Sequence, residues 1–254
     1  MAVTRDRPGR SQDGLTLIEV LISMIILSIV TTMLVMGWVN LQRGSAFALS
    51  SNNARASARD AIARVSNELR AAQPTTLPTP TPSATVTPAA QPPITAATQW
   101  DVSFYSAYNS ANAAADGSGV AASAVRLTRI YLDTSTVPPA PWNPQGRTLY
   151  LLRDMNGNGT LTDSADLKVL LARNVVNTVI ADPTNGTSYT ALFRYAYRTS
   201  VSSPAQWMDN TSGTLVLGNI VAIRVRVIID ANIAHTPKYI DATTTVRLRN
   251  ASGS

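Results

Sequence analysis

The stretch that decides the fold is residues 13–39, DGLTLIEVLISMIILSIVTTMLVMGWV, a nearly unbroken apolar run with one carboxylate, Glu19, close to its start. From Leu15 to Val39 the run has about 25 residues, enough for an α-helix to cross the hydrocarbon core of a bilayer. The preceding polar residues include three arginines, which predicts a cytoplasmic amino terminus. We therefore expect a transmembrane segment over residues 15–39.

Apolar residues keep a helical spacing beyond this run. Over residues 58–72 they recur every three or four positions, at Ala58, Ile62, Val65, Leu69 and Ala72, which is typical of a helix with one apolar face. We expect one helix over residues 15–73, because proline at position 74 cannot continue it. Residues 74–98 are rich in proline and threonine and are predicted to form a linker, either a plain spacer or a loop that carries glycans.

Residues 99–254 have the pattern of strands separated by turns. Apolar and polar residues alternate in several runs, for example in IRVRV at residues 223–227, which indicates an antiparallel sheet with one buried face. The apolar stripe of residues 58–72 is the expected partner of that face. The predicted fold class is therefore α+β, with one long N-terminal helix packed on an antiparallel β-sheet head.

Composition restricts the chemistry of this head. The chain has no cysteine and one histidine, so it offers no thiolate nucleophile, no disulfide and no multi-histidine metal centre. We expect no enzymatic activity. The net charge of +6 comes mostly from arginine. Arg224 with Arg226, and Arg247 with Arg249, are two residues apart and share a face if they lie on strands, which predicts a basic surface that either faces solvent or contacts DNA phosphates.

The block GLTLIEVL at residues 14–21 resembles the type III signal of type IV prepilins and type II secretion pseudopilins. In that family a polar leader ends in glycine, and the fifth residue after the cut is a glutamate inside an apolar helix. The resemblance implies that residues 1–14 are a cytoplasmic leader peptide. It also implies that a prepilin peptidase of the inner membrane cuts between Gly14 and Leu15 and methylates the new amine of Leu15. The order of helix, loop and sheet is similar to the pilin architecture.

Glu19 has a physical role within this resemblance. A carboxylate in hydrocarbon costs roughly 2.5 to 3.5 kcal/mol on insertion scales, and such a group persists when it gains a partner. Cleavage creates a cation at Leu15, and in a bundle of staggered helices Glu19 of one subunit can pair with the Leu15 amine of its neighbour. The alternatives are a pair with its own amine, contact with the headgroups, or a chance acid in a plain membrane anchor.

Four further stretches are similar to the PilW-like, or J-type, minor pilins: residues 54–72, 193–198, 220–229 and 243–250. The apolar run lacks a central proline and the chain lacks cysteine, which separates it from the family's major subunits. The resemblance implies a minor pilin or pseudopilin that primes or caps a type IV pilus or a related secretion or DNA-uptake filament. It would lie in the inner membrane first, and then in the periplasm or at the cell surface.

The partners implied are the prepilin peptidase and other pilins, which contact the N-terminal helix. The alternative function is a single-pass anchored β-domain that binds a surface ligand, a glycan or DNA, without joining a filament. The mature amino terminus separates the two functions.

Residues 154–166, DMNGNGTLTDSAD, are comparable with a calcium-binding loop. Asp154, Asn156, Asn158 and Thr160 occupy positions one, three, five and seven, and Gly159 supplies the sharp turn at position six. Position twelve is alanine rather than a bidentate acid, but Asp163 and Asp166 are close enough in sequence to substitute for it. The same letters also suit an Asn-Gly hairpin between two strands.

Overall fold

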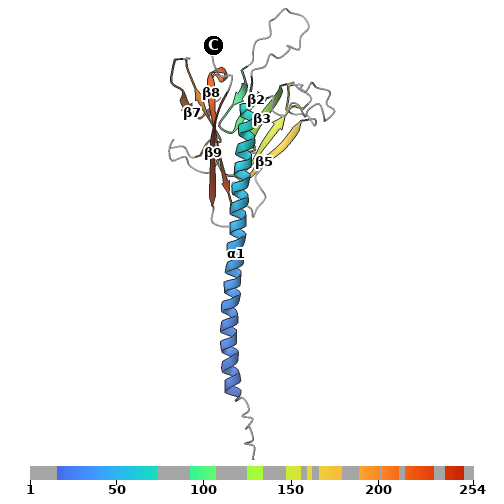
Figure 1. The fold of residues 1–254 in the computed structure, drawn as a ribbon, viewed down its shortest axis with the longest axis vertical. Coiled ribbons are helices and arrows are strands. Elements are labelled where there is room, and N and C mark those ends of the chain that lie inside the picture. The colour runs from blue at the N-terminus through green and yellow to red at the C-terminus, as the bar shows by residue number, and fades with distance from the viewer. Residues whose placement is uncertain are drawn as a thin grey trace, which may run out of the picture. The chain divides into compact units, whose positions relative to one another are not determined.

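The computed structural model describes residues 16–73, 92–106, 125–133, 147–155, 159–161, 166–178, 189–200, 202–211, 215–231 and 238–248 (Figure 1). Over these ranges the chain forms the helix α1 (Leu17–Arg70), a short 3₁₀ turn at Leu217–Asn219, and nine strands. The strands are β1 (Ile94–Ala97), β2 (Asp101–Ser106), β3 (Arg126–Asp133), β4 (Arg147–Arg153), β5 (Leu167–Val175), β6 (Phe193–Tyr197), β7 (Gln206–Met208), β8 (Ile220–Asp230) and β9 (Tyr239–Arg247). The chain divides into two compact units, residues 1–49 and 50–254, which we describe separately.

The strands of the second unit form one antiparallel sheet in the order β1-β2-β3-β4-β5-β8-β6-β7, with β9 paired to β8. The strands β1 to β5 follow one another as a meander. Their link to the remaining strands is narrow, because β5 and β8 share one register pair, Val175 with Ile229. The sheet therefore has two halves, β1–β5 and β7-β6-β8-β9.

The helix residues from Ser50 onward supply the core that both halves share. Ala58, Val65, Leu69 and Ala72 are buried in one cluster with side chains from β1 to β6, β8 and β9. Figure 1 shows this part of α1 lying along both halves of the sheet. Ile62, the remaining member of the predicted stripe, is partly buried against the cluster. The predicted α+β fold class, a long N-terminal helix packed on an antiparallel sheet, is confirmed.

Three details differ from the sequence prediction. The helix ends at Arg70 rather than at Gln73, because the backbone of residues 72 and 73 leaves the helix to join the sheet. Ala72 forms a bridge with Ser106, and the Gln73 amide donates to the carbonyl of Tyr105 at 3.0 Å. The predicted linker 74–98 is too long, because residues 94–97 form β1 and pair with β2. The short strand β7 was not predicted.

A buried ion pair connects α1 to the sheet. The guanidinium of Arg153, on β4, pairs with the Glu68 carboxylate, and both side chains are at most 10% exposed. Ser106 on β2 donates a second hydrogen bond to Glu68 at 3.1 Å. Burial raises the pKa of Glu68, which the Arg153 cation and these hydrogen bonds oppose. The carboxylate therefore depends on its partners to remain charged inside the head.

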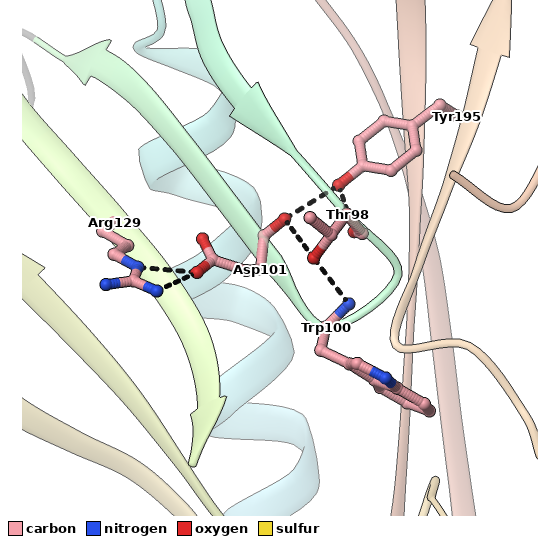
Figure 2. A network of polar contacts seen from close by, with 5 residues as sticks. All are labelled: Thr98, Trp100, Asp101, Arg129 and Tyr195. Carbon is pink, nitrogen blue, oxygen red and sulfur yellow. Dashed lines mark hydrogen bonds and ion pairs between the residues drawn. The ribbon is translucent and has the colours of Figure 1, made fainter. Parts of the chain in front are cut away.

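Polar side chains also join the two halves of the sheet. Figure 2 shows the Tyr195 hydroxyl, on β6, shared between the carbonyl oxygens of Thr98 and Asp101 at 2.7 and 3.2 Å. In the same view the carboxylate of Asp101 accepts a hydrogen bond from Arg129 Nε at 2.6 Å. Burial raises the pKa of Tyr195 well above its ordinary value, so the hydroxyl stays protonated and remains a donor. The turn between β1 and β2 is thereby attached to β6.

The buried ion pair leads to a stability prediction. We expect Arg153→Met to destabilise the head by about 3 to 5 kcal/mol, because the buried Glu68 loses the cation that compensates its charge. A double variant, Arg153→Met with Glu68→Leu, should lose less than Arg153→Met alone, because no charge is then buried. Chemical denaturation of the full chain in detergent, followed by tryptophan fluorescence, measures both.

The matched control is Arg64→Met, which breaks the exposed pair between Arg64 and Asp60 within α1. We expect this variant to lose about 1 kcal/mol or less. A double variant that is less stable than Arg153→Met would contradict the account of Glu68 as a charge that needs its partner.

Candidate assembly site on the N-terminal helix

The first unit is an apolar helical segment whose side chains are exposed in every direction. Large apolar residues are exposed all along residues 17–49, from Leu17, which is 84% exposed, to Leu49, which is 64% exposed. Among the described residues, α1 is the one helix long and apolar enough to cross a membrane. Between Glu19 and Arg43 the sequence has no charged residue. This surface is suited to lipid or to other apolar helices rather than to water.

Glu19 lies in the first turn of this helix. The carbonyl of Thr16 accepts the backbone N–H groups of Glu19 and Val20, at 3.0 and 3.2 Å, so the helix is already formed at the acid. An acid in the first turn interacts favourably with the positive end of the helix dipole. The carboxylate makes no ion pair with any residue that the structure describes. Gly14 and Leu15 lie outside the described residues, so the predicted pair of Glu19 with the Leu15 amine stays a prediction.

Three hydroxyl groups of the apolar segment are satisfied within the helix itself. Ser23, Thr31 and Thr32 each donate to the carbonyl four residues earlier, at 2.7 to 2.8 Å. A polar group in hydrocarbon needs such an internal partner, because no water is present to replace it. Glu19 is the charged group of this segment, and the described part of the helix supplies no cation to pair with it.

Comparisons with known proteins agree with this geometry at the amino terminus. Residues 9–35 match the model of the prokaryotic N-terminal methylation motif. The matched range contains Gly14, Leu15 and Glu19. Neither curated proteins nor solved structures give a match to the chain.

The motif and the helix together indicate a chain of the pilin or pseudopilin kind. The motif lies at the start of a helix that is long and apolar enough to cross a membrane, and in chains that carry it the motif implies processing by a prepilin peptidase and assembly with other pilins. Such chains are in general structural subunits rather than enzymes. The long helix on an antiparallel sheet is the pilin-like α+β arrangement that the motif implies.

The predicted calcium loop is described in part. Asn156, Asn158 and Asp163 lie outside the described residues. Asp154 is buried and its Oδ2 accepts the backbone N–H of Gly159 at 2.8 Å. Gly159 has a φ of +77°, the left-handed conformation that the sharp turn of such a loop needs. The first and sixth positions thus have suitable geometry, whereas the ligand set itself stays a prediction.

The alternative of a hairpin is confirmed for its two strands, because β4 and β5 pair as antiparallel neighbours with Arg153 opposite Leu167. Residues 156–158 of the Asn-Gly turn lie outside the described residues, so the turn itself stays a prediction. Among the described residues there is no group of three or more acidic or histidine side chains that could hold a metal ion. A calcium site here needs the amide and carboxylate groups of the undescribed positions.

A basic surface was predicted from residue spacing, and part of it is confirmed. Arg224 and Arg226 lie on the same partly exposed face of β8, because the residues between and beside them point into the core. Arg247 is exposed on β9, and Arg249 lies outside the described residues. Sequence reasoning missed Trp207 and Asp209, which lie in and after β7, since three residues are too few to show an alternating pattern.

The loop leads to a metal-binding prediction. If residues 154–166 hold calcium, millimolar Ca²⁺ raises the melting temperature of the full chain in detergent more than Mg²⁺ does, because the larger ion suits oxygen-rich flexible loops. Removal of Ca²⁺ by a chelator reverses the shift. Asp163→Asn should reduce it, whereas Asp60→Asn on the exposed side of α1 should leave it unchanged. An equal shift in both variants would leave no role for this loop.

Proposed function

We propose that this chain is a minor pilin or pseudopilin that helps to prime or cap a type IV pilus or a related secretion or DNA-uptake filament. The single observation that carries the proposal is the match of residues 9–35 to the methylation motif on a helix whose apolar side chains are exposed all round. An exposed apolar helix with one acid has two environments available, the bilayer and a bundle of similar helices. A filament subunit uses both in turn.

The proposed order along the chain follows the signal. Residues 1–14 form a cytoplasmic leader that the prepilin peptidase removes. Residues 15–39 hold the subunit in the inner membrane before assembly, with the amino terminus in the cytoplasm. A proline- and threonine-rich linker follows the helix and ends before β1, and the β-rich head lies in the periplasm or at the cell surface.

We propose that Glu19 selects the position of each subunit in the bundle. Cleavage after Gly14 makes the amine of Leu15 a cation, and a neighbouring helix displaced along the bundle axis brings its Glu19 to that amine. The pair removes the cost of an isolated charge in hydrocarbon, roughly 2.5 to 3.5 kcal/mol on insertion scales. Subunits without such a neighbour stay in the bilayer.

A face suited to helix packing lies further along the same segment. Ser28, Thr31 and Thr32 line a shallow groove on the helix surface between larger apolar side chains, those of Met24, Leu27, Val35 and Met36. Small residues four positions apart let a second helix approach closely, and this approach drives association where no hydrophobic effect operates. The groove supports assembly with other pilin helices through the apolar half of α1.

Two sequence features favour a minor subunit over the main subunit of a shaft. The apolar run has no proline and the chain has no cysteine. The resemblance implies that the family's major subunits have a proline in the middle of the apolar run and a carboxy-terminal disulfide. The stretches 54–72, 193–198, 220–229 and 243–250 support the PilW-like, or J-type, group within the minor pilins. The plain membrane anchor without assembly remains the competing function, and processing separates the two.

The first test is the mature amino terminus. Intact-mass analysis of the protein from its native envelope should show a chain that begins at methylated Leu15. Gly14→Val should retain residues 1–14, because a side chain at this position crowds the protease site. Gly37→Ala is the matched control, since an added Cβ meets nothing within 4 Å, and it should be processed normally. A start at Met1, or a cut beyond residue 35, would rule out the filament function.

The second test separates anchoring from assembly. We expect Glu19→Gln to be processed and inserted as well as the unchanged protein, because it places no charge in the bilayer, but to be absent from purified filaments or pilin complexes. Ser23→Ala, one turn further along, removes a hydroxyl that bonds only within the helix and should assemble normally. Immunoblots of membrane and filament fractions measure both. Normal incorporation of Glu19→Gln would exclude the charge pair.

A further inference from the structure

The partly exposed face of β6, β8 and β9 carries a cluster of arginines that helix assembly does not use. Arg194 on β6 is the register partner of Arg224 on β8, and Arg226 follows two residues later on the same face. Together with Asp241 and Thr243 of β9 they line a pocket of about 280 Å³, which we call the arginine pocket; Thr190 and Ala191 complete its lining.

The charges of the arginine pocket do not balance. Arg226 donates through Nε and Nη2 to Asp241 Oδ2, at 2.9 and 2.6 Å. Arg194 Nε lies 2.6 Å from Asp209 Oδ1. Arg224 forms no ion pair with any residue that the structure describes. Arg194 and Arg226 therefore each have a carboxylate partner among the described residues, and Arg224 has none there. Like charges directly opposite each other on neighbouring strands are destabilising, so the arrangement leaves a demand for an anion.

The Arg224 side chain is already fixed in a position from which it can bind such an anion. Its guanidinium lies over the Trp207 ring, 4.3 Å from the ring centroid. Stacking occupies the flat face of the guanidinium and leaves the N–H donors at its edge available. A side chain fixed in this way loses little conformational entropy when it binds a ligand.

The donor set fits phosphate better than carboxylate. Asp241 lines the pocket and pairs with Arg226, and Asp209 pairs with Arg194. A phosphate group has more acceptor oxygens and can accept hydrogen bonds from two guanidinium groups at the same time. At about 280 Å³ the pocket is smaller than a typical ligand site, so it holds one phosphate while the remainder of the ligand extends across the sheet.

Beyond the pocket a second cation lies on the same face. Arg247 is exposed on β9, where its register partner is Ala222, two residues before Arg224. It forms no ion pair with the described residues. A ligand with repeated phosphates can contact Arg224 and Arg247 together. The net charge of +6 favours the approach of such a polyanion.

We propose that the arginine pocket, with Arg224 at its centre and Arg247 beside it, binds phosphate groups of a DNA backbone. Because Arg224 already covers the Trp207 ring, bases have no stacking partner there, and binding is independent of sequence and sensitive to salt. This site belongs to the head and does not depend on the assembly of the helix.

The test is fluorescence anisotropy of a labelled 20-base-pair duplex with the full-length chain in a neutral detergent. We expect Arg224→Gln to weaken binding at least about tenfold at low salt, the loss typical of a charge-assisted hydrogen bond. The slope of log affinity against log salt concentration should fall by about 0.9 for the lost phosphate contact. Arg173→Gln, on the exposed side of β5, removes the same charge away from the pocket and should change affinity much less.

Each outcome decides the proposal. Equal losses in Arg224→Gln and Arg173→Gln would show attraction by net charge alone and overturn the site. If Arg224→Gln fails to fold by its melting curve, Arg247→Gln replaces it, and this variant must weaken binding more than Arg173→Gln does. A second titration uses inorganic pyrophosphate as the competitor. If pyrophosphate binds as tightly as the duplex, the pocket serves a small phosphorylated molecule and the DNA proposal is wrong.

Discussion

The burial of one apolar stripe is the interaction on which the head depends. Ala58, Val65, Leu69 and Ala72 are covered by a sheet whose two halves share a single register pair, so neither half closes a core without the helix between them. The hydrophobic effect requires the same removal from water for residues 17–49, but no part of the chain that the structure describes covers them. The head therefore buries its own apolar surface, whereas the apolar segment does not. This is expected for a subunit whose apolar segment is covered by a membrane or by other helices.

Two acids on the same helix show the difference between these regions. Glu68 is buried in the head, where burial raises its pKa, and the chain itself provides Arg153 and Ser106 as partners. Glu19 lies among apolar side chains and has no ion-pair partner among the described residues. A charge in hydrocarbon without a partner is costly, so Glu19 needs a partner outside the described chain once a membrane or a helix bundle surrounds it. Under the proposed function, this partner is the amine that processing creates at Leu15.

The helix and strand faces that depend on the spacing of apolar residues could be predicted from the sequence. The apolar run, the helical stripe and the strand alternation of residues 223–227 each correspond to observed structure, because a face of a helix or strand follows from spacing alone. Contacts between distant segments were not predictable in this way. The helix end at Arg70 results from the pairing of Ala72 with Ser106, and β1 forms within a proline-rich region because β2 offers it an edge. In β3 the residues that face inward include Arg126, which donates to the Met155 carbonyl at 2.6 Å, whereas Leu127 faces outward. A hydrophobicity pattern alone places Leu127 inward and Arg126 outward.

The same limit explains why the spacing of Arg224 and Arg226 indicated a shared face but not a pocket. The pocket arises because the register places Arg194, thirty residues earlier in the chain, opposite Arg224, and because β7 brings Trp207 under the Arg224 guanidinium.

The two proposed binding surfaces differ in the interaction that stabilises the bound state. Helix packing in lipid depends on close contact and changes little with salt, whereas phosphate contacts are screened and weaken as counterions accumulate. A single chain can therefore join a helix bundle through residues 17–49 while its head binds and releases a polyanion, since neither interaction draws on the residues of the other.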